Sequence, residues 1–373
     1  MKPPFKPKRI LMLKGHSAGI GDLLRSSAAW RVLKNAYPEA ELHLLLLSRE
    51  PGYPSEELIR EHHLLNGFYV VDKRTPNREQ RRRYWADLNR VAQQARPDLV
   101  IDFEPSGLRT SVVTAWFAWR WGARTVGINT APGRALFYGQ AAPSPRKFAR
   151  QRGLRWPLDY TERDFVALAA LGLTRAGCPI ELRETESGRR VRLALRREHG
   201  LAESAPLLGL NIGCGTPDAI AKRPDLGLLS ELVAGLERDH GLRLVLMGAP
   251  FERAINQEFC AIHRQRSALP VIDLAGETTI SSLTGVINAC ALFISTDSGP
   301  FHIGVAMRVP TLAVFRWDNR EHFHAHPWVR CCIIGASEPL PPLRRAAEEL
   351  LAWGRSSRTG ESKFSRPPLA ATE

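Results

Sequence analysis

The chain has 373 residues, of which 44% are hydrophobic and 24% are charged, so large-scale disorder is excluded and a globular protein is expected. The length suits two domains, and no apolar run approaches the roughly 20 residues that a membrane-spanning helix needs. The net charge of +14 favours anionic partners such as nucleic acid, a membrane surface or a phosphorylated substrate, although solvated surface arginine would give the same total.

The cysteines and the N-terminus indicate a cytoplasmic protein. The six cysteines show neither a CxxC spacing nor histidines at metal-ligand intervals, so we expect reduced, packing cysteines and no zinc site. The basic N-terminus, MKPPFKPKRI, leads directly into the apolar run ILML, without the h-region or cleavage site of a signal peptide.

The first half of the chain alternates between strand-like and helix-like segments. The expected strands are Ile10–Leu13, Glu41–Leu47, Leu99–Phe103 and Val126–Ile128. The expected helices are Asp22–Ala36, Arg81–Ala95, Thr110–Trp121 and Tyr160–Leu171. Such alternation predicts a parallel sheet with helices on both of its faces.

A polar and charged stretch, Thr174–Glu203, is the predicted domain junction, and a second alternation follows it. The expected strands are Leu207–Ile212, Leu242–Met247, Val271–Asp273, Ala291–Ile294 and Thr311–Phe315, with helices at Leu226–Asp239, Ser281–Ala289, after Gly299, and near Leu343–Trp353. We therefore predict an α/β protein of two Rossmann-like, doubly wound lobes with a cleft between them. The lobes are expected to cover residues 1–185 and 200–350, and residues 354–373 are expected to be a disordered tail.

The loop Ser295-Thr296-Asp297-Ser298-Gly299 joins an apolar strand to a helix-like run. It would present backbone N–H groups, hydroxyls, an acid and His302 at a helix N-terminus, which is a good environment for phosphate. The alternative is that Asp297 or Ser298 only caps the helix and that His302 is an ordinary first-turn residue.

The first glycine-rich loop contains Gly19 and Gly21 but has Leu24 where a dinucleotide-binding fingerprint has its third glycine. Ser48-Arg49 follows the second strand, in place of an acid that would hold a ribose, so a dehydrogenase is disfavoured. Asp22 at the end of the loop is either a helix cap or a cleft-facing carboxylate suited to general-base catalysis.

The second half offers further candidates for binding a nucleotide. The glycine turn from Asn211 to Thr216 is followed by Lys222, and such a turn with a nearby lysine can grip a phosphate. The spacing differs from that of an ATPase loop. Glu252, shortly after a strand, is either a ribose ligand or an exposed acid in the first turn of a helix.

Five stretches in order, covering roughly Lys8–Phe315, resemble the family 9 glycosyltransferases, the group of the ADP-heptose:lipopolysaccharide heptosyltransferases. They are KRILMLKGHSAGIGDLLRSSAAWRVLKNAYPEAELHLL, PDLVIDFEPSGLRTS with WGARTVGI, YTERDFVALAALGL, NIGCGTPDAIAKRPD with LVLMGAPFE, and STDSGPFHIGVAMRVPTLAVF. The last of these is the most specific.

The resemblance implies a GT-B fold in which the first lobe binds the acceptor and the second binds the nucleotide-sugar. It also implies an inverting transfer without a metal or other cofactor. Asp22, on the Gly19 to Gly21 loop of the acceptor side, would be the general base. The donor site would comprise Thr216, Lys222 at the phosphates, Glu252 at the ribose, and Asp297, Ser298, Gly299 and His302 at the diphosphate and sugar.

The chain departs from the family pattern at several positions. Serine replaces threonine at 298, Ala28 replaces a proline, Glu104-Pro105-Ser106-Gly107 replaces a glutamine-glycine pair, and Arg316-Trp317-Asp318 replaces glycine-proline-threonine. The last two lie in the regions expected to bind acceptor and donor, so they bear on specificity.

The leading hypothesis is transfer of heptose from ADP-heptose to a lipopolysaccharide-type acceptor at the cytoplasmic face of the inner membrane. The basic surface would meet anionic lipid, and no nucleic-acid partner is expected. The alternatives are a GT-B enzyme with another donor or acceptor, including an epimerase, and a non-catalytic polyanion-binding protein.

Overall fold

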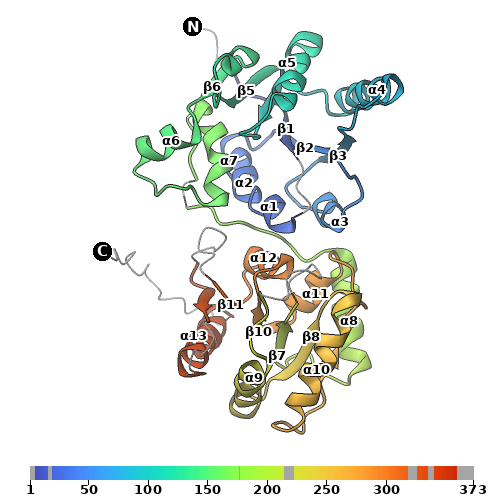
Figure 1. Ribbon diagram of the computed structural model, residues 1–373, viewed down its shortest axis with the longest axis vertical. Helices are drawn as coiled ribbons and strands as arrows, with labels where there is room; N and C mark the ends of the chain where they lie inside the picture. Colours follow the sequence, from blue (N-terminus) through green and yellow to red (C-terminus); the bar gives the residue numbers. More distant parts are fainter. Residues whose placement is uncertain are drawn as a thin grey trace. The chain divides into compact units, whose positions relative to one another are not determined.

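The computed structural model describes residues 5–15, 19–175, 177–213, 222–317, 326–334 and 340–358, and these divide into two compact units. The first unit holds the described residues up to Glu186 together with Thr279–Ser281, and the second holds the others. Each unit contains a six-stranded parallel sheet flanked by helices (Figure 1). The predicted pair of doubly wound α/β lobes is therefore confirmed.

The first unit follows the predicted alternation and adds elements that were not expected. Its strands are β1 (Arg9–Gly15), β2 (Glu41–Ser48), β3 (Gly67–Asp72), β4 (Leu99–Asp102), β5 (Arg124–Ile128) and β6 (Gln140–Ala142). Its helices are α1 (Ile20–Leu24), α2 (Ser27–Ala36), α3 (Pro54–Arg60), α4 (Arg78–Ala95), α5 (Arg109–Trp121), α6 (Pro145–Arg152) and α7 (Tyr160–Leu168), with 3₁₀ turns η1 (Arg134–Phe137) and η2 (Ala169–Leu171).

Alternate residues of the central strands face opposite sides of the first sheet. Leu11 and Leu13 of β1 pack with Leu45 and Leu47 of β2 beneath α4 and α5. The residue between the first pair, Met12, is also fully buried. A strand buried on both faces must be apolar along its whole length, which explains the continuous apolar runs in the sequence.

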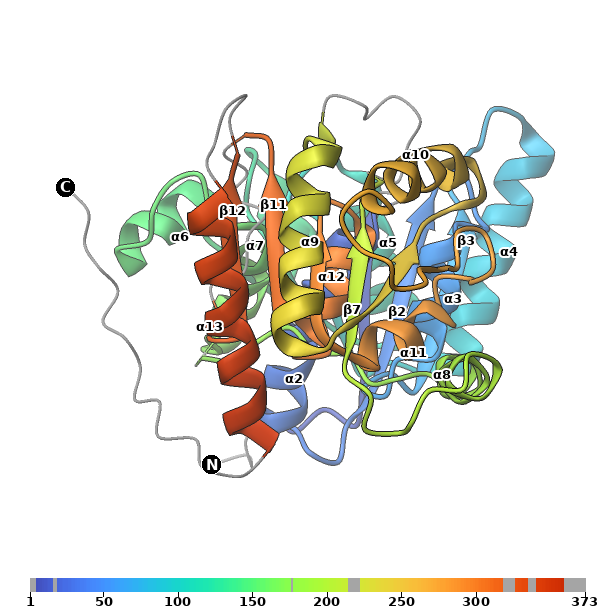
Figure 2. The same ribbon diagram turned by 90° about the horizontal axis from the view of Figure 1, so that it is seen from below.

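The second unit is built in the same way. Its strands are β7 (Leu207–Asn211), β8 (Arg243–Met247), β9 (Ile272–Asp273), β10 (Cys290–Ser295), β11 (Thr311–Phe315) and β12 (Val329–Ile333). Its helices are α8 (Glu186–Glu198), α9 (Leu226–His240), α10 (Arg253–His263), α11 (Leu283–Asn288), α12 (Gly299–Ala306) and α13 (Leu340–Arg358), with the 3₁₀ turn η4 (Pro250–Glu252). Figure 2 shows α9 and α13, which contact each other, side by side over one face of the second sheet.

Both sheets reverse their strand order at one point. The orders are β3-β2-β1-β4-β5-β6 and β12-β11-β10-β7-β8-β9, so the reversals lie between β1 and β4 and between β10 and β7. Ligands of open α/β sheets bind beyond the carboxyl ends of the strands at such a switch point. The fold therefore indicates one candidate binding position in each unit.

Two local predictions are corrected. The single helix predicted from Asp22 to Ala36 is two helices, because the hydroxyls of Ser26 and Ser27 bond backward to the carbonyls of Asp22 and Leu24 at the break. The predicted junction, Thr174–Glu203, does contain the boundary between the two units, which follows Glu186, and it also contains α8, which buries Leu195. At the other end of the chain, α13 continues to Arg358, and the rest of the predicted tail lies outside the described residues.

Within the part of the chain that the structure describes, no helix is both long enough and apolar enough to cross a membrane.

Candidate functional site

The switch point of the second sheet positions most of the predicted donor residues. Asn211 ends β7, and Asp297 and Ser298 follow the neighbouring strand β10. Both strands end at the same edge of the sheet. Asn211 and Ser298, which are 87 positions apart along the chain, therefore become neighbours. We call the residues gathered here the donor cluster: Asn211, Gly213, Lys222, Glu252, Thr296, Asp297 and Ser298.

A buried hydrogen-bond network joins the two strand ends. Asn211 Nδ2 donates to the Ser298 hydroxyl at 3.0 Å and to the Gly213 carbonyl at 3.0 Å, and the Thr296 hydroxyl donates to the same carbonyl. Ser298 stands at the N-cap position of α12, yet its side chain makes no capping bond and lies 3.3 Å from Ser295 Oγ. Ser298 therefore occupies the capping position, as the alternative proposed, but its side chain does not cap the helix.

Lys222 and Asp297 form an ion pair in the donor cluster. Lys222 Nζ lies 3.1 Å from Asp297 Oδ2, and the Asp297 side chain is 10% exposed while that of Lys222 is 32% exposed. An ammonium group has three donors, so this lysine can keep its carboxylate partner and still contact an anionic ligand.

Glu252 is buried, with 3% of its surface exposed, so the alternative of an exposed helix acid is wrong. Its Oε2 accepts a hydrogen bond from the Ala249 N–H at 2.7 Å. A Cβ at Gly213 would lie only 1.6 Å from Glu252 Oε1. The carboxylate therefore lies directly over the Gly213 backbone and belongs to the donor cluster.

The remaining predicted donor residues lie in or near α12. The helix begins at Gly299 and has Pro300 in its first turn, where a missing N–H breaks no helical bond. His302 is buried in the same helix, with its ring edge-on to Phe301 at 5.0 Å between centroids. Thr216 lies outside the described residues.

Asp22 lies in the first turn of α1, in the first unit. Gly19 occupies the N-cap position and Gly21 is buried, so Asp22 is not the N-cap residue that one alternative proposed. Its side chain is 40% exposed, and Oδ1 accepts a hydrogen bond from Arg25 Nη1 at 3.1 Å. An accessible carboxylate of this kind can act as a general base.

Two cations that were not predicted hold α1 in place. The buried Arg25 guanidinium lies 4.6 Å from the centre of the Tyr160 ring of α7. Lys14, near the end of β1, donates to Ser26 Oγ at 2.6 Å and lies 2.9 Å from both carboxylate oxygens of Asp164. The sequence did show a lysine at the end of an apolar strand, which could have pointed to Lys14. Its partner Asp164, however, lies 150 residues away along the chain.

A pocket of about 960 Å³ opens at the switch point of the first sheet. Glu104 is one of its lining residues, and its Oε2 accepts a hydrogen bond from the Gly15 N–H at 3.1 Å. Four cations contribute to its lining, namely Arg49, Lys73, Arg74 and Arg109. Burial, together with the charge of Arg49, lowers the pKa of Lys73. This concentration of positive charge suits an anionic ligand.

A buried ion pair supports the loop that carries Glu104. Arg134 donates from Nη2 to the Glu104 carbonyl at 2.6 Å and from Nη1 to the Pro105 carbonyl at 2.7 Å. The same guanidinium lies 3.4 Å from Asp102, which also accepts from the Tyr138 hydroxyl at 2.7 Å. Burial raises the pKa of Asp102, and the Tyr138 hydroxyl and the Arg134 charge act in the opposite direction.

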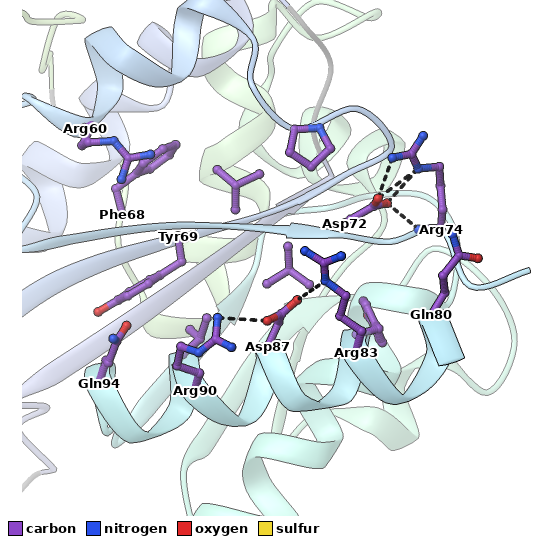
Figure 3. Close-up of a pocket in the computed structure, with 15 residues that line it drawn as sticks. Arg60, Phe68, Tyr69, Asp72, Arg74, Gln80, Arg83, Asp87, Arg90 and Gln94 are labelled. Atoms are coloured by element: carbon purple, nitrogen blue, oxygen red, sulfur yellow. Dashed lines mark hydrogen bonds and ion pairs between the residues drawn. The ribbon is translucent and has the colours of Figure 1, made fainter. Parts of the chain in front are cut away.

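Another pocket, of about 790 Å³, lies between β3 and α4 (Figure 3). Both of its carboxylates are already paired, since Asp87 lies 3.0 Å from Arg90 and Asp72 lies 2.6 Å from Arg74. None of the predicted site residues lines it, so we assign it no role in binding substrate.

A sequence profile described as glycosyltransferase family 9 (heptosyltransferase) matches residues 214–348, the region that contains Lys222, Glu252 and the β10–α12 loop of the donor cluster. Over this region the chain is similar to glycosyltransferase family 9. Lipooligosaccharide heptosyltransferase 2 of Campylobacter jejuni is 30% identical over 128 residues, which are 34% of this chain. The match spans 39% of the length of that curated relative.

Solved structures of family 9 glycosyltransferases are similar in fold to this chain over nearly its whole length, and they share its two-lobe GT-B architecture. A family 9 glycosyltransferase of Veillonella parvula superposes with a TM-score of 0.67 at 21% identity, covering 93% of this chain and 97% of the other. The ADP-heptose lipopolysaccharide heptosyltransferase II of Escherichia coli superposes with a TM-score of 0.64 at 21% identity, covering 94% and 99%. The GT-B prediction is therefore confirmed.

Proposed function

We propose that this protein is an inverting glycosyltransferase that moves heptose from ADP-heptose onto a lipopolysaccharide core-type acceptor, without a metal ion. The donor cluster carries the proposal: a lysine, two carboxylates and a helix N-terminus gather at the switch point of the sheet, within or beside the region that matches the family profile. The Campylobacter jejuni and Escherichia coli proteins named above are heptosyltransferases, which supports this choice of sugar.

The donor cluster would hold the leaving group of the transfer. As the bond between the anomeric carbon and the diphosphate oxygen breaks, negative charge develops on the diphosphate. The Lys222 ammonium and the N-terminal backbone of α12 would stabilise this charge electrostatically. Glu252 would accept hydrogen bonds from ribose hydroxyls, which a buried carboxylate over a glycine backbone can do at close range.

The first unit would supply the acceptor and the base. Asp22 would take the proton of the acceptor hydroxyl as that oxygen forms its bond to the anomeric carbon, giving inversion in one displacement. The cationic pocket around Glu104 would bind an anionic group of the acceptor. Because such an acceptor is lipid-linked, we also propose a cytoplasmic protein that associates with the inner face of the inner membrane.

One observation favours a second candidate, a GT-B enzyme with a different nucleotide-sugar. Arg316 and Trp317 directly follow β11, at a position where the family was expected to continue with glycine and proline, and the Trp317 side chain is exposed. Bulky residues beside the donor would alter the choice of sugar or base. Incubation with the donor alone, followed by product analysis, separates an epimerase from a transferase, since an epimerase needs no acceptor.

Calorimetric titration of the full chain with ADP, UDP and GDP tests the proposal. ADP should bind most tightly. Lys222→Ala should weaken ADP binding by roughly 10- to 100-fold, the value of a hydrogen bond to a charged group, and should leave adenosine binding unchanged. Arg190→Ala, at an exposed position of α8, is the matched control.

The outcomes of this titration are distinct. Preference for UDP or GDP would contradict the ADP-heptose assignment while leaving a glycosyltransferase in place. Absence of binding to all three nucleotides would contradict the proposed function itself.

A further inference from the structure

One continuous segment, residues 105–158, contains no acidic side chain. Its 54 residues include nine arginines and lysines and four tryptophans, so it contributes nine of the fourteen net positive charges of the chain. All 38 Asp and Glu residues lie elsewhere. We call residues 105–158 the acid-free segment.

The acid-free segment forms the β6 end of the first unit. It comprises α5, β5, η1, β6 and α6, and Figure 1 shows these elements grouped around the edge strand β6. The contacts are continuous, since α5 packs on β5 and η1, β5 pairs with β6, and α7 links β6 to α6. These contacts join the elements of the segment at the β6 end of the first unit, with α6 attached through α7, which lies outside the segment.

The cations of this segment are exposed and lack acidic partners. Arg134 is the buried exception, paired with Asp102. The other eight are exposed: Arg109, Arg120, Arg124, Arg146, Lys147, Arg150, Arg152 and Arg155. None of these eight forms an ion pair with an acidic residue in the described ranges, whereas cations elsewhere in the unit, such as Arg31 and Arg74, do.

Large apolar side chains are exposed among these cations. Trp119 is 81% exposed and Leu136 is 89% exposed. Of the ten large hydrophobic side chains that are exposed among the described residues, six belong to this segment: Leu108, Val112, Trp119, Leu136, Leu154 and Trp156. Leu108, Val112 and Trp119 recur at helical spacing and form an outward stripe at α5.

We infer that the acid-free segment is the surface by which this protein docks on an anionic lipid bilayer, with cations at the head groups and Trp119, Leu136 and their neighbours in the interfacial layer. Unpaired cations complement anionic head groups, while tryptophan and aliphatic side chains partition into the layer below. Aliphatic leucines and valine cannot stack on bases, which disfavours nucleic acid. The inference refines the membrane association suggested under the proposed function, which it otherwise leaves untouched.

Co-sedimentation of the full chain with vesicles tests this surface. Phosphatidylcholine vesicles with and without phosphatidylglycerol separate the charge contribution from the apolar one. One variant, Trp119→Ser with Leu136→Ser, removes apolar surface, and a second, Arg146→Ser with Arg150→Ser, removes charge. Leu193→Ser with Arg190→Ser, on the exposed side of the basic helix α8, is the matched control.

We expect binding to the phosphatidylglycerol vesicles that weakens with salt and that falls about tenfold or more in each of the two segment variants. The control should bind like the unmodified chain. ADP binding, measured on the same samples, should be unchanged in all variants, which keeps failure of this surface separate from failure of the proposed function. Equal vesicle binding by all variants, or binding to single-stranded DNA but not to vesicles, would overturn the inference.

Discussion

At the scale of single residues, the donor cluster depends on a glycine. Gly213 has no side chain, so the Glu252 carboxylate can lie against its backbone while its carbonyl accepts from Asn211 and Thr296. A methyl group at this position would occupy the space of the carboxylate. The sequence showed a glycine turn here, but only the structure shows which side chain requires it.

Gly213→Ala should therefore displace Glu252. We expect a loss of roughly 1–3 kcal/mol in the free energy of unfolding, as for other overpacked sites, and a weaker affinity for ADP. Gly235→Ala is the control within the same unit, because it lies inside α9 where alanine favours the helix and its Cβ would meet only the tip of Arg344. Denaturant titration measures both variants. If Gly213→Ala is as stable as the parent and binds ADP equally, the position assigned to Glu252 is wrong.

The candidate site was only partly predictable from residues alone. Asp22, Lys222 and Asp297 stand in short motifs whose chemistry is visible in sequence. Lys14 and Arg134 were not found, because their roles depend on partners that the fold brings from other elements. Such pairings have no local pattern.

At the scale of elements, the loop after β4 is held by Arg134 of η1. The guanidinium binds the backbone carbonyls of Glu104 and Pro105 and pairs with Asp102, so it sets the shape of one wall of the cationic pocket. Arg134 is a positioning residue in this account, since it acts through Glu104.

Arg134→Met should destabilise the protein by about 3–5 kcal/mol, because it leaves the Asp102 charge buried without its cation. Asp102→Asn in addition should recover part of this loss, which a double-mutant cycle measures. Arg120→Met, at an exposed position of α5, should be neutral. In transfer assays of the folded variants, KM for the acceptor should rise more than kcat falls. Additive losses in the cycle would contradict the coupling of Arg134 with Asp102.

Strands and helices were predicted correctly where the sequence has a strong hydrophobic pattern. They were missed where side-chain hydrogen bonds to the backbone decide the local structure. The central strands are continuous apolar runs, and nearly all were located within two residues. The break between α1 and α2 depends on serine hydroxyls that compete for backbone carbonyls. The edge strand β3 was not predicted, although its sequence GFYVVD is largely apolar. The inner face of α8 buries little, so its charged sequence resembled a linker.

At the scale of the whole molecule, stability should depend on pH through His62. This buried ring accepts from the Leu64 N–H at Nδ1 and lies 2.8 Å from the Glu181 carbonyl at Nε2, contacts that suit the neutral form. Burial, above all, lowers its pKa to about 4, from 6.5. Between about pH 4 and pH 6.5, the His62 ring is therefore mostly neutral in the folded state and mostly protonated in the unfolded state.

The contribution of neutral His62 to the free energy of unfolding is fully present above pH 6.5 and should be lost as the pH falls toward 4. The loss is roughly 3 kcal/mol from the difference of the two pKa values. Denaturant titrations across this pH range measure it. The pH slope should flatten in His62→Phe and persist in His199→Gln, which changes an exposed histidine. An unchanged slope in His62→Phe would assign the pH dependence to other groups.

The most direct test of the account is the rate of heptose transfer by Asp22→Asn, measured with ADP-heptose and a lipopolysaccharide acceptor. If Asp22 is the general base, the turnover rate should fall by about 10²- to 10⁴-fold while the dissociation constant of the donor stays unchanged. Turnover close to that of the unmodified chain would contradict the central claim, because another group would then accept the proton.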